Sequence, residues 1–289
     1  MTSWIDFWDR PNAIYVNQRN LDAHFECLTR DIQRFVPAGG RKAVLDFGCG
    51  EALGAERLAE GCSTLYLYDA APAVRKRLRK RLAHDGRIIV LDDQDLRRLD
   101  AGTIDLILVV SVIQYMAKDE LVSLLGFWHR LLKPAGELIV ADVIEPETSM
   151  LLDVASQLRF AWSHGFLLPA LAGIARMFFS DYRELRRKAG FAMYPSGEMI
   201  GLLRGAGFDG AGLPANLGPG RHRRAYKGRK APALPLAEDH AVAMDQSPAS
   251  PSAKVRSALS SIKVLLRTRA SMRICSRMMT ANFTFITSI

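Results

Sequence analysis

The sequence lacks long apolar runs, cysteine pairs and a leader segment. No stretch reaches the roughly 18 uncharged apolar residues that a membrane-spanning helix needs, so we expect no such helix. The four cysteines stand far apart and form no Cys-x-x-Cys pair, which argues against a disulfide framework and a thiolate metal site. The six histidines show no metal-ligand spacing, and residues 1–10 lack the features of a secretory signal. These absences favour a cytoplasmic protein without bound metal.

Positive charge is confined to the end of the chain. The formal net charge is +9, but residues 221–289 alone carry 13 Lys and Arg against 3 Asp and Glu. Residues 1–220 have a net charge of −1. Because nucleic-acid binding needs a basic surface, we expect no nucleic acid as a partner of the main domain.

The composition and the hydrophobic pattern predict a globular α/β fold. The chain has 289 residues, of which 49% are hydrophobic and 24% charged, as in ordinary globular proteins. Between residues 41 and 144, short β-branched apolar runs alternate with amphipathic stretches, a pattern that predicts a doubly wound, mostly parallel sheet covered by helices. The expected strands are Ala43–Phe47, Thr64–Tyr68, Arg87–Leu91, Ile104–Ser111 and Glu137–Ile144.

The expected helices and the composition divide the chain into four parts. Residues 1–40 form an N-terminal helical cap with a helix at Asn20–Phe35, and residues 41–230 form the main domain. This domain includes a helical insertion after the fifth strand, at residues 147–190. A linker at 231–252 and a basic tail at 253–289 follow. Further expected helices are Ala52–Glu60, Pro72–Ala83, Asp119–Leu132 and Ser196–Gly205, and weaker strand signals cover Phe208–Leu213 and Arg224–Arg229.

The basic tail has two interpretations. Lys254–Met279 carries seven Lys and Arg residues among Leu, Ile and Met, which is typical of an amphipathic helix that touches an anionic membrane or a partner. A solvated appendage without fixed structure is the alternative. The localisation is therefore cytoplasmic, with peripheral membrane contact left open.

The most informative stretch is a buried strand that runs into a glycine turn, Val44-Leu45-Asp46-Phe47-Gly48-Cys49-Gly50. Glycines at such a junction let a ligand approach the backbone, and ligands of these sheets bind beyond the carboxyl ends of the strands. Asp69 ends the next strand, 23 positions after Asp46, where a carboxylate can accept both hydroxyls of an adenosine ribose. The pattern predicts a nucleotide-like cofactor.

The turn fits a nicotinamide dinucleotide poorly. That cofactor requires Gly-x-Gly-x-x-Gly, but Leu53 stands at the third glycine position and Gly54 follows one residue later. The charge of Asp46 also suits a cationic amino-acid ligand better than a diphosphate.

The sequence resembles the class I S-adenosylmethionine-dependent methyltransferases over residues 12–210. Four motifs carry the resemblance: Asp46-Phe47-Gly48-Cys49-Gly50, Asp92-Asp93-Gln94-Asp95-Leu96, Asp105-Leu106-Ile107-Leu108-Val109-Val110-Ser111 and Leu132-Lys133-Pro134-Ala135-Gly136-Glu137-Leu138. Ala52 departs from the family, in which a third glycine is common.

The resemblance implies S-adenosylmethionine as cofactor and assigns residues to it. Gly48 and Gly50, with Asp46, would face the methionine part, and Asp69 would hold the ribose hydroxyls. Asp92 or Asp93 would contact the adenine amino group. Helix capping is the alternative for Asp46 and Asp69, and solvated surface is the alternative for the acidic turn.

Residues after the fourth strand and before the first long helix are further candidates. Ser111 is a candidate cofactor-binding residue, and Ser111 and Gln114 both lie at the end of the fourth strand, near where the acceptor should sit. Ordinary strand termination is equally compatible. Tyr15, Asn17 and Arg19 are placed to fold over the methionine carboxylate, and packing is their alternative role.

A general base is needed only if the acceptor is a hydroxyl, because the sulfonium is already an activated methyl donor. His164, Asp153 and Tyr182 in the insertion are candidates. His164 is preferred because a histidine titrates near neutral pH and this one flanks the apolar run Gly165–Phe179. A structural role is its alternative.

The insertion also points to the acceptor. Its apolar residues exceed what one helical face needs, which predicts a lid or channel for an apolar or lipid-like molecule, with core or oligomer packing as the alternative. The motifs that methylate nucleic-acid bases are missing from the sequence.

We therefore expect an enzyme that methylates a small, apolar molecule, preferentially at oxygen. One alternative is an RNA or protein methyltransferase whose basic tail recruits the substrate. Another is a partner protein that binds S-adenosylmethionine without transferring its methyl group. The oligomeric state and the identity of the acceptor are not predicted.

Overall fold

The computed structural model describes residues 4–9, 15–148, 150–178 and 190–231, which belong to one unit of the chain. The predicted basic tail and the predicted linker, apart from Ala231, lie outside the described residues.

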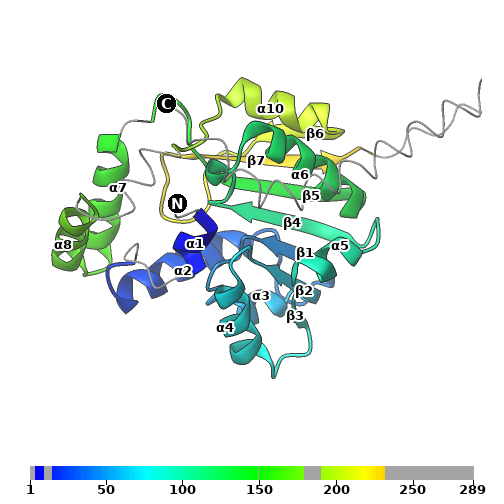
Figure 1. The fold of residues 1–289 in the computed structure, drawn as a ribbon, viewed down its shortest axis with the longest axis horizontal. Helices are drawn as coiled ribbons and strands as arrows, with labels where there is room; N and C mark the ends of the chain where they lie inside the picture. Colours follow the sequence, from blue (N-terminus) through cyan, green and yellow to red (C-terminus); the bar gives the residue numbers. More distant parts are fainter. Residues whose placement is uncertain (1–3, 10–14, 149, 179–189, 232–289) are drawn as a thin grey trace, which may run out of the picture. The chain divides into compact units, whose positions relative to one another are not determined.

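A seven-stranded sheet with the order β3-β2-β1-β4-β5-β7-β6 forms the centre of this unit (Figure 1). Strands β1 to β5 are parallel, whereas β7 is antiparallel to both of its neighbours. This confirms the predicted doubly wound, mostly parallel fold. The strands are β1 Lys42–Phe47, β2 Cys62–Tyr68, β3 Ile88–Val90, β4 Ile104–Val110, β5 Leu132–Val143, β6 Phe208–Gly212 and β7 Arg224–Lys230.

Helices connect and cover the strands, and most lie where the periodicity predicts them. Ser196–Gly205 forms α10 with the expected bounds, and Pro72 begins α4, as its missing N–H allows at a first helical turn. The helices are α1 Trp4–Asp9, α2 Gln18–Ile32, α3 Ala55–Ala59, α4 Pro72–Leu82, α5 Asp93–Arg98, α6 Lys118–Leu131, α7 Met150–Ser163, α8 Leu167–Phe178 and α10 Ser196–Gly205, with a 3-10 turn at Ile113–Tyr115.

Both faces of the sheet are buried, which explains why its central strands are continuously apolar. In β4, Ile107 and Val109 face one core with Trp128 of α6, whereas Leu106 and Leu108 face another with Leu78 of α4. Alternate residues of a strand point to opposite faces, so a strand covered on both sides needs apolar side chains throughout.

Three local predictions were wrong or incomplete. Helix α3 begins at Ala55 rather than Ala52, because Ala52 has a φ of 42°, which no right-handed helix allows. The acidic stretch after β3 is not a simple turn, since Asp92 caps α5. The short helix α1 was not predicted.

The insertion contains α7 and α8, whereas residues 179–189 lie outside the described part. Ala161, Phe166 and Ala170 pack against Ala23 of α2, so the insertion contacts the N-terminal helices. The outer residues Leu151, Trp162 and Leu168 are 75–81% exposed. Among the described helices, none is long and apolar enough to cross a membrane.

The strand order reverses between β1 and β4, which places a ligand crevice at their carboxyl ends. In Figure 1, the arrowhead of β4 points toward the side on which α1 and α2 lie. The glycine turn after β1 reaches this edge.

Candidate active site

The glycine turn adopts backbone conformations that L side chains resist. Gly48 has a φ of +79° and Gly50 a φ of +55°. A Cβ atom on Gly48 would lie 2.3 Å from Cγ2 of Val112, so the turn depends on the absence of a side chain there. The Gly48 N–H donates to the Tyr68 carbonyl at 2.7 Å, which ties the turn to β2.

Asp69 lies at the end of β2 and contacts the same turn. Its Oδ2 accepts a hydrogen bond from the Gly50 N–H at 3.0 Å, and its Oδ1 accepts one from the Ala71 N–H at 2.9 Å. Burial raises the pKa of Asp69, and these two hydrogen bonds oppose that shift. Each carboxylate oxygen has a second lone pair that a ligand hydroxyl can use.

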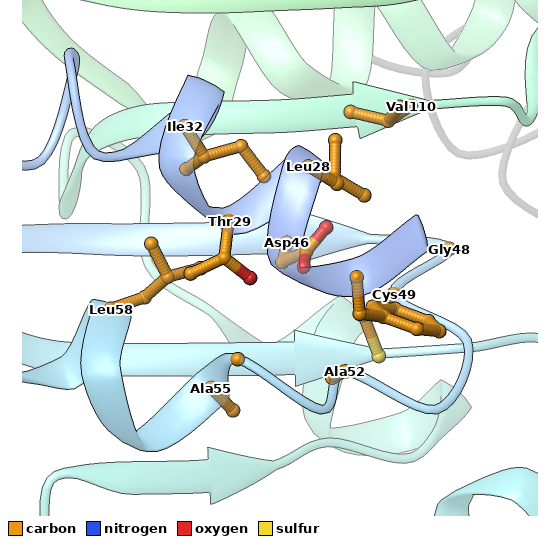
Figure 2. A pocket seen from close by; sticks show the side chains of 12 residues that line it. Leu28, Thr29, Ile32, Asp46, Gly48, Cys49, Ala52, Ala55, Leu58 and Val110 are labelled. Carbon is orange, nitrogen blue, oxygen red and sulfur yellow. The ribbon is translucent and has the colours of Figure 1, made fainter. Parts of the chain in front are cut away.

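Asp46 lies beneath the turn, beside a small cavity of about 30 Å³. Figure 2 shows its carboxyl group between the turn that holds Gly48 and Cys49 and the α2 residues Leu28 and Thr29. Burial and, to a smaller extent, the nearby Asp69 carboxylate raise the pKa of Asp46 to about 7. A cation bound nearby would favour the ionised form of Asp46.

The departure from the family's glycine pattern has a structural explanation. Ala52, which stands where a third glycine is common, takes a left-handed φ of 42°. The close helix contact falls instead on Gly54, where a Cβ atom would lie 1.9 Å from Oγ1 of Thr29 in α2. Gly54 thus lets α2 approach the start of α3.

The acidic residues after β3 have structural partners. Asp92 Oδ1 accepts hydrogen bonds from the N–H groups of Gln94 and Asp95, and Asp95 in turn accepts from the Asp92 N–H. This reciprocal capping box begins α5. The hydrogen bonds from the Asp95 and Gln94 N–H groups lower the pKa of Asp92, and burial opposes this shift. Asp93 accepts a hydrogen bond from the Tyr68 hydroxyl at 2.8 Å and pairs with Arg75 at 3.4 Å.

Ser111 lies at the end of β4 and contacts Asp142, a β5 residue that the sequence analysis missed. The Ser111 hydroxyl donates to Asp142 Oδ2 at 2.6 Å. Arg223 Nη1 donates to the same oxygen at 2.8 Å, and its Nη2 lies 3.1 Å from Oδ1 of Asp153 in α7. A carboxylate inside the apolar run Leu138–Val143 was the available signal for Asp142.

The three candidates of the N-terminal segment have partners in α2 or the insertion. The Tyr15 ring lies 5.4 Å from that of His24 and 6.3 Å from that of Phe25 in α2, measured between centroids, and burial raises the pKa of Tyr15. Asn17 caps α2 by accepting from the Asn20 N–H, and Arg19 donates to the Gly165 carbonyl at 3.4 Å.

The candidate bases of the insertion differ in their placement. His164 ends α7, where its Nδ1 lies 2.9 Å from both the Phe160 carbonyl and the Ser163 hydroxyl. No described contact joins His164 to Ser111 or to the glycine turn. Asp153 belongs to the Arg223 network, and Tyr182 lies outside the described residues.

An aromatic cluster next to Ser111 was also missed. Trp4 of α1 lies 4.5 Å from Tyr115 and 5.5 Å from Phe191, measured between ring centroids, and Trp8 lies 6.2 Å from Tyr115. Asp9 accepts a hydrogen bond from the Ala73 N–H of α4, so α1 runs from the Asp69 side to the Ser111 side of the edge. Within the described ranges, no group of three acidic, His or Cys side chains could hold a metal ion.

Comparisons with known proteins agree with this geometry. Residues 45–140 match the family model described as a methyltransferase domain. No curated protein sequence matches the chain. One similar structure is a chain of the complex between the Haloferax volcanii Trm112 methyltransferase activator and a methyltransferase, with a TM-score of 0.52 and 16% identity over 80% of this chain and 99% of that one.

Two further structures have lower scores. Magnesium protoporphyrin IX methyltransferase from Synechocystis PCC 6803 with bound S-adenosylmethionine has a TM-score of 0.48 and 14% identity over 79% of this chain and 89% of that one. An O-methyltransferase family protein from Burkholderia thailandensis has a TM-score of 0.48 and 18% identity over 78% and 66%, respectively.

The matched region contains the second half of β1, the strands β2 to β4, the glycine turn, Asp69 and most of β5. Fold, turn geometry and family match coincide in the same residues. Residues 45–140 therefore match a methyltransferase domain, and the described residues share the fold of the methyltransferase complex structure.

Proposed function

We propose that this enzyme transfers the methyl group of S-adenosylmethionine to a small, apolar acceptor, with oxygen as the acceptor atom. The observation that carries the proposal is the hydrogen bond between the Gly50 N–H and Asp69, inside the matched region. It joins the glycine turn to a carboxylate that is suited to bind ribose hydroxyls, at the same edge of the sheet.

The residues at this edge fit the cofactor chemically. A ligand has room beside the Gly50 backbone, because a Cβ atom there would meet only Phe25 among the described residues, at 3.9 Å. The positive charge of the methionine part would stabilise the ionised form of Asp46, whose pKa burial raises. Asp69 would accept hydrogen bonds from the ribose hydroxyls. Asp92 and Asp93 remain proposed adenine contacts, with Asp93 also bonded to Tyr68.

When bound, S-adenosylmethionine supplies a methyl group that is already activated for transfer. The protein then has to hold the acceptor in line and exclude water. Helix α1, which contacts both Ala73 and Tyr115, is the element that we propose to supply this cover. Ser111 lies at the β4 end, between the proposed cofactor residues and the Asp142 network.

A general base would contribute about 10²- to 10⁴-fold if the acceptor is a hydroxyl. His164 stays our proposed base, although in the structure its Nδ1 faces the Phe160 carbonyl. Its Nε2 is the atom through which it would act on an acceptor.

The acceptor is proposed to be apolar because of the insertion. Helices α7 and α8 expose Leu151, Trp162 and Leu168, more apolar surface than helix packing needs. Residues 1–220 have a net charge of −1, which disfavours a nucleic-acid substrate for this domain.

Calorimetric titration tests the cofactor assignment. S-adenosylmethionine and S-adenosylhomocysteine should bind with micromolar affinity and NADH should give no heat, and an acceptor screen with labelled methyl donor would follow. Binding of NADH without binding of the other two would overturn the proposed function.

A further inference from the structure

A polar cluster lies at the carboxyl ends of β4 and β5. Apart from Ser111, it contains no residue that we propose to bind the cofactor. Ser111 has a φ of 58° and Asp142 a φ of 63°, both in the left-handed region that side chains avoid. The two residues lie on neighbouring strands, and their side chains are hydrogen-bonded at 2.6 Å. Such strain persists only where the surrounding structure fixes it, and it concentrates at functional sites.

Two further residues, both from the segment before β7, hold the backbone and the carboxylate of Asp142. Asn216 accepts a hydrogen bond from the Asp142 N–H at 2.8 Å, and Arg223 donates to Asp142 Oδ2 at 2.8 Å. Within the described part of the chain, Asp142 Oδ1 accepts only a long hydrogen bond of 3.4 Å, from the Asn216 amide. One oxygen of the carboxylate thus retains capacity to accept a strong hydrogen bond.

The charges of the cluster favour a ligand group that donates a hydrogen bond over an anionic ligand group. Arg223 is shared between the carboxylates of Asp142 and Asp153, and the side chains of all three are at most 17% exposed. The two carboxylates outnumber the single guanidinium. The cluster therefore has a net negative charge when His222, which bonds Asp153, is neutral. A carboxylate or phosphate on a ligand would be repelled here.

Gln114 adds a second acceptor. It is 4% exposed, and its Nε2 donates to the Ser111 carbonyl at 2.9 Å. Its Oε1 is buried and has no hydrogen-bond partner among the described residues. A buried acceptor without a donor is costly, so a ligand hydroxyl or amine that reaches it would be favoured.

Aromatic rings border the polar cluster. Tyr115 follows Gln114 directly, and the rings of Trp4, Trp8 and Phe191 surround Tyr115 at centroid distances of 4.5–6.2 Å. The four rings come from α1, the turn after β4 and the segment after the insertion, and each is half-buried. Half-buried rings offer faces and edges on which a flat apolar molecule can stack.

We propose that Ser111, Asp142, Gln114 and Tyr115 form the acceptor-binding corner, and that the acceptor is an aromatic molecule with a hydroxyl or amino group. The aromatic ring packs on the Tyr115 cluster, and the donor group hydrogen-bonds to Asp142. This inference rests on the proposed function, because it places a methyl acceptor beside the cofactor edge.

The test measures the binding of three probes to the full chain saturated with S-adenosylhomocysteine. Titrations followed by ligand-observed NMR compare 2-naphthol, 2-naphthoate and 1-octanol. We expect 2-naphthol to bind at least tenfold more tightly than either of the others. Tighter binding of 1-octanol would overturn the aromatic assignment, and tighter binding of 2-naphthoate would overturn the acidic corner.

Variants locate the site. Asp142→Asn should weaken 2-naphthol at least fivefold and reduce its advantage over 2-naphthoate, because the negative charge is removed. Glu145→Gln is the matched control, since Glu145 is a nearby carboxylate that pairs with Arg224 at 2.8 Å, and it should change neither affinity. Equal effects of both variants would overturn the proposal.

A second variant covers the case that Asp142→Asn does not fold. Tyr115→Leu leaves the Asp142–Arg223 pair in place and should weaken 2-naphthol while sparing S-adenosylhomocysteine. Unchanged 2-naphthol affinity would overturn the proposal. If the wild type did not bind S-adenosylhomocysteine, the proposed function itself would be refuted. Failure of the acceptor proposal and failure of the proposed function are therefore distinguishable.

Discussion

The Gly50 N–H and the Asp69 carboxylate, 19 residues apart in the sequence, are joined by a hydrogen bond of 3.0 Å. This bond connects the turn after β1 to the end of β2. Asp69 therefore holds the turn in place in addition to its proposed contact with the ribose, and its substitution should affect the turn and the ligand together.

Asp69→Ala should weaken S-adenosylmethionine binding by about 1 to 3 kcal/mol, because hydrogen bonds to a charged group are lost. Isothermal titration calorimetry measures the change, with thermal unfolding as a check on folding. Asp69→Asn, which keeps one acceptor oxygen, should lose less. An unchanged affinity in a folded Asp69→Ala protein would remove this residue from the site.

Gly48→Ala should destabilise the protein more than Gly102→Ala. Both glycines have a positive φ, +79° and +69°, but only a Cβ on Gly48 meets Val112, whereas nothing lies within 4 Å at Gly102. We expect about 1 kcal/mol for Gly102→Ala from backbone strain alone, and a further 1 to 3 kcal/mol at Gly48 from the clash.

Urea unfolding of the two glycine variants measures this difference. Val112→Ala added to Gly48→Ala should recover part of the extra loss, because it removes the clashing methyl. Equal destabilisation at the two glycines would contradict the close approach of Val112.

The contribution of Asp46 to the free energy of unfolding should fall as pH rises from about 4 to 7. Its pKa is raised to about 7 in the folded protein, whereas an aspartate in the unfolded chain ionises near 4. The folded state therefore holds a proton that the unfolded state has released. The resulting stability is complete below about 4 and is lost as pH rises through about 7.

The measurement is the free energy of unfolding in urea from pH 5 to 8, taken as wild type minus Asp46→Asn so that other groups cancel. A difference that does not decrease over this range would show that Asp46 ionises normally. Saturating S-adenosylmethionine should also flatten the difference, because a bound cation favours the carboxylate.

Arg223→Gln should destabilise the protein by about 3 kcal/mol, because it leaves the carboxylates of Asp142 and Asp153 without their cation in a largely buried place. The neighbouring Arg224→Gln is its control. Arg224 pairs with Glu145 but is 59% exposed, so we expect a loss below about 1 kcal/mol. Similar losses in urea unfolding would contradict the distinction between the two pairs.

His164→Ala separates a catalytic from a structural histidine. A structural role predicts a stability loss of about 1 kcal/mol, from the hydrogen bond to the Phe160 carbonyl, with methyl transfer unchanged. A catalytic role predicts a fall in kcat of about 10²-fold or more. The stability loss and the change in kcat can both be measured on this variant once the acceptor screen has found a substrate.

Much of the fold could be predicted because its signals are local. Continuous apolar runs follow from strands covered on both faces, and the helix at Ser196–Gly205 was placed with its observed bounds. The start of α5 was available as well, since Asp92 and Asp95 have the spacing of a capping box, but the stretch was interpreted only as an acidic turn.

The candidate site was predicted where it depends on strand ends and missed where it depends on packing. Gly48, Gly50 and Asp69 follow strands β1 and β2, so their convergence follows from parallel pairing. Trp4 lies 111 residues before Tyr115, and no periodicity indicates that their rings meet.

The sequence alone predicted the parallel sheet and the glycine turn, because each depends on residue types within short segments, and its resemblance to a family predicted the cofactor. Only the tertiary structure decided that Asp142 meets Ser111 and Arg223, which are 31 and 81 residues away. Hydrophobic patterning fixes which face of a strand is buried, whereas polar contacts between distant segments depend on how the elements pack around the finished sheet.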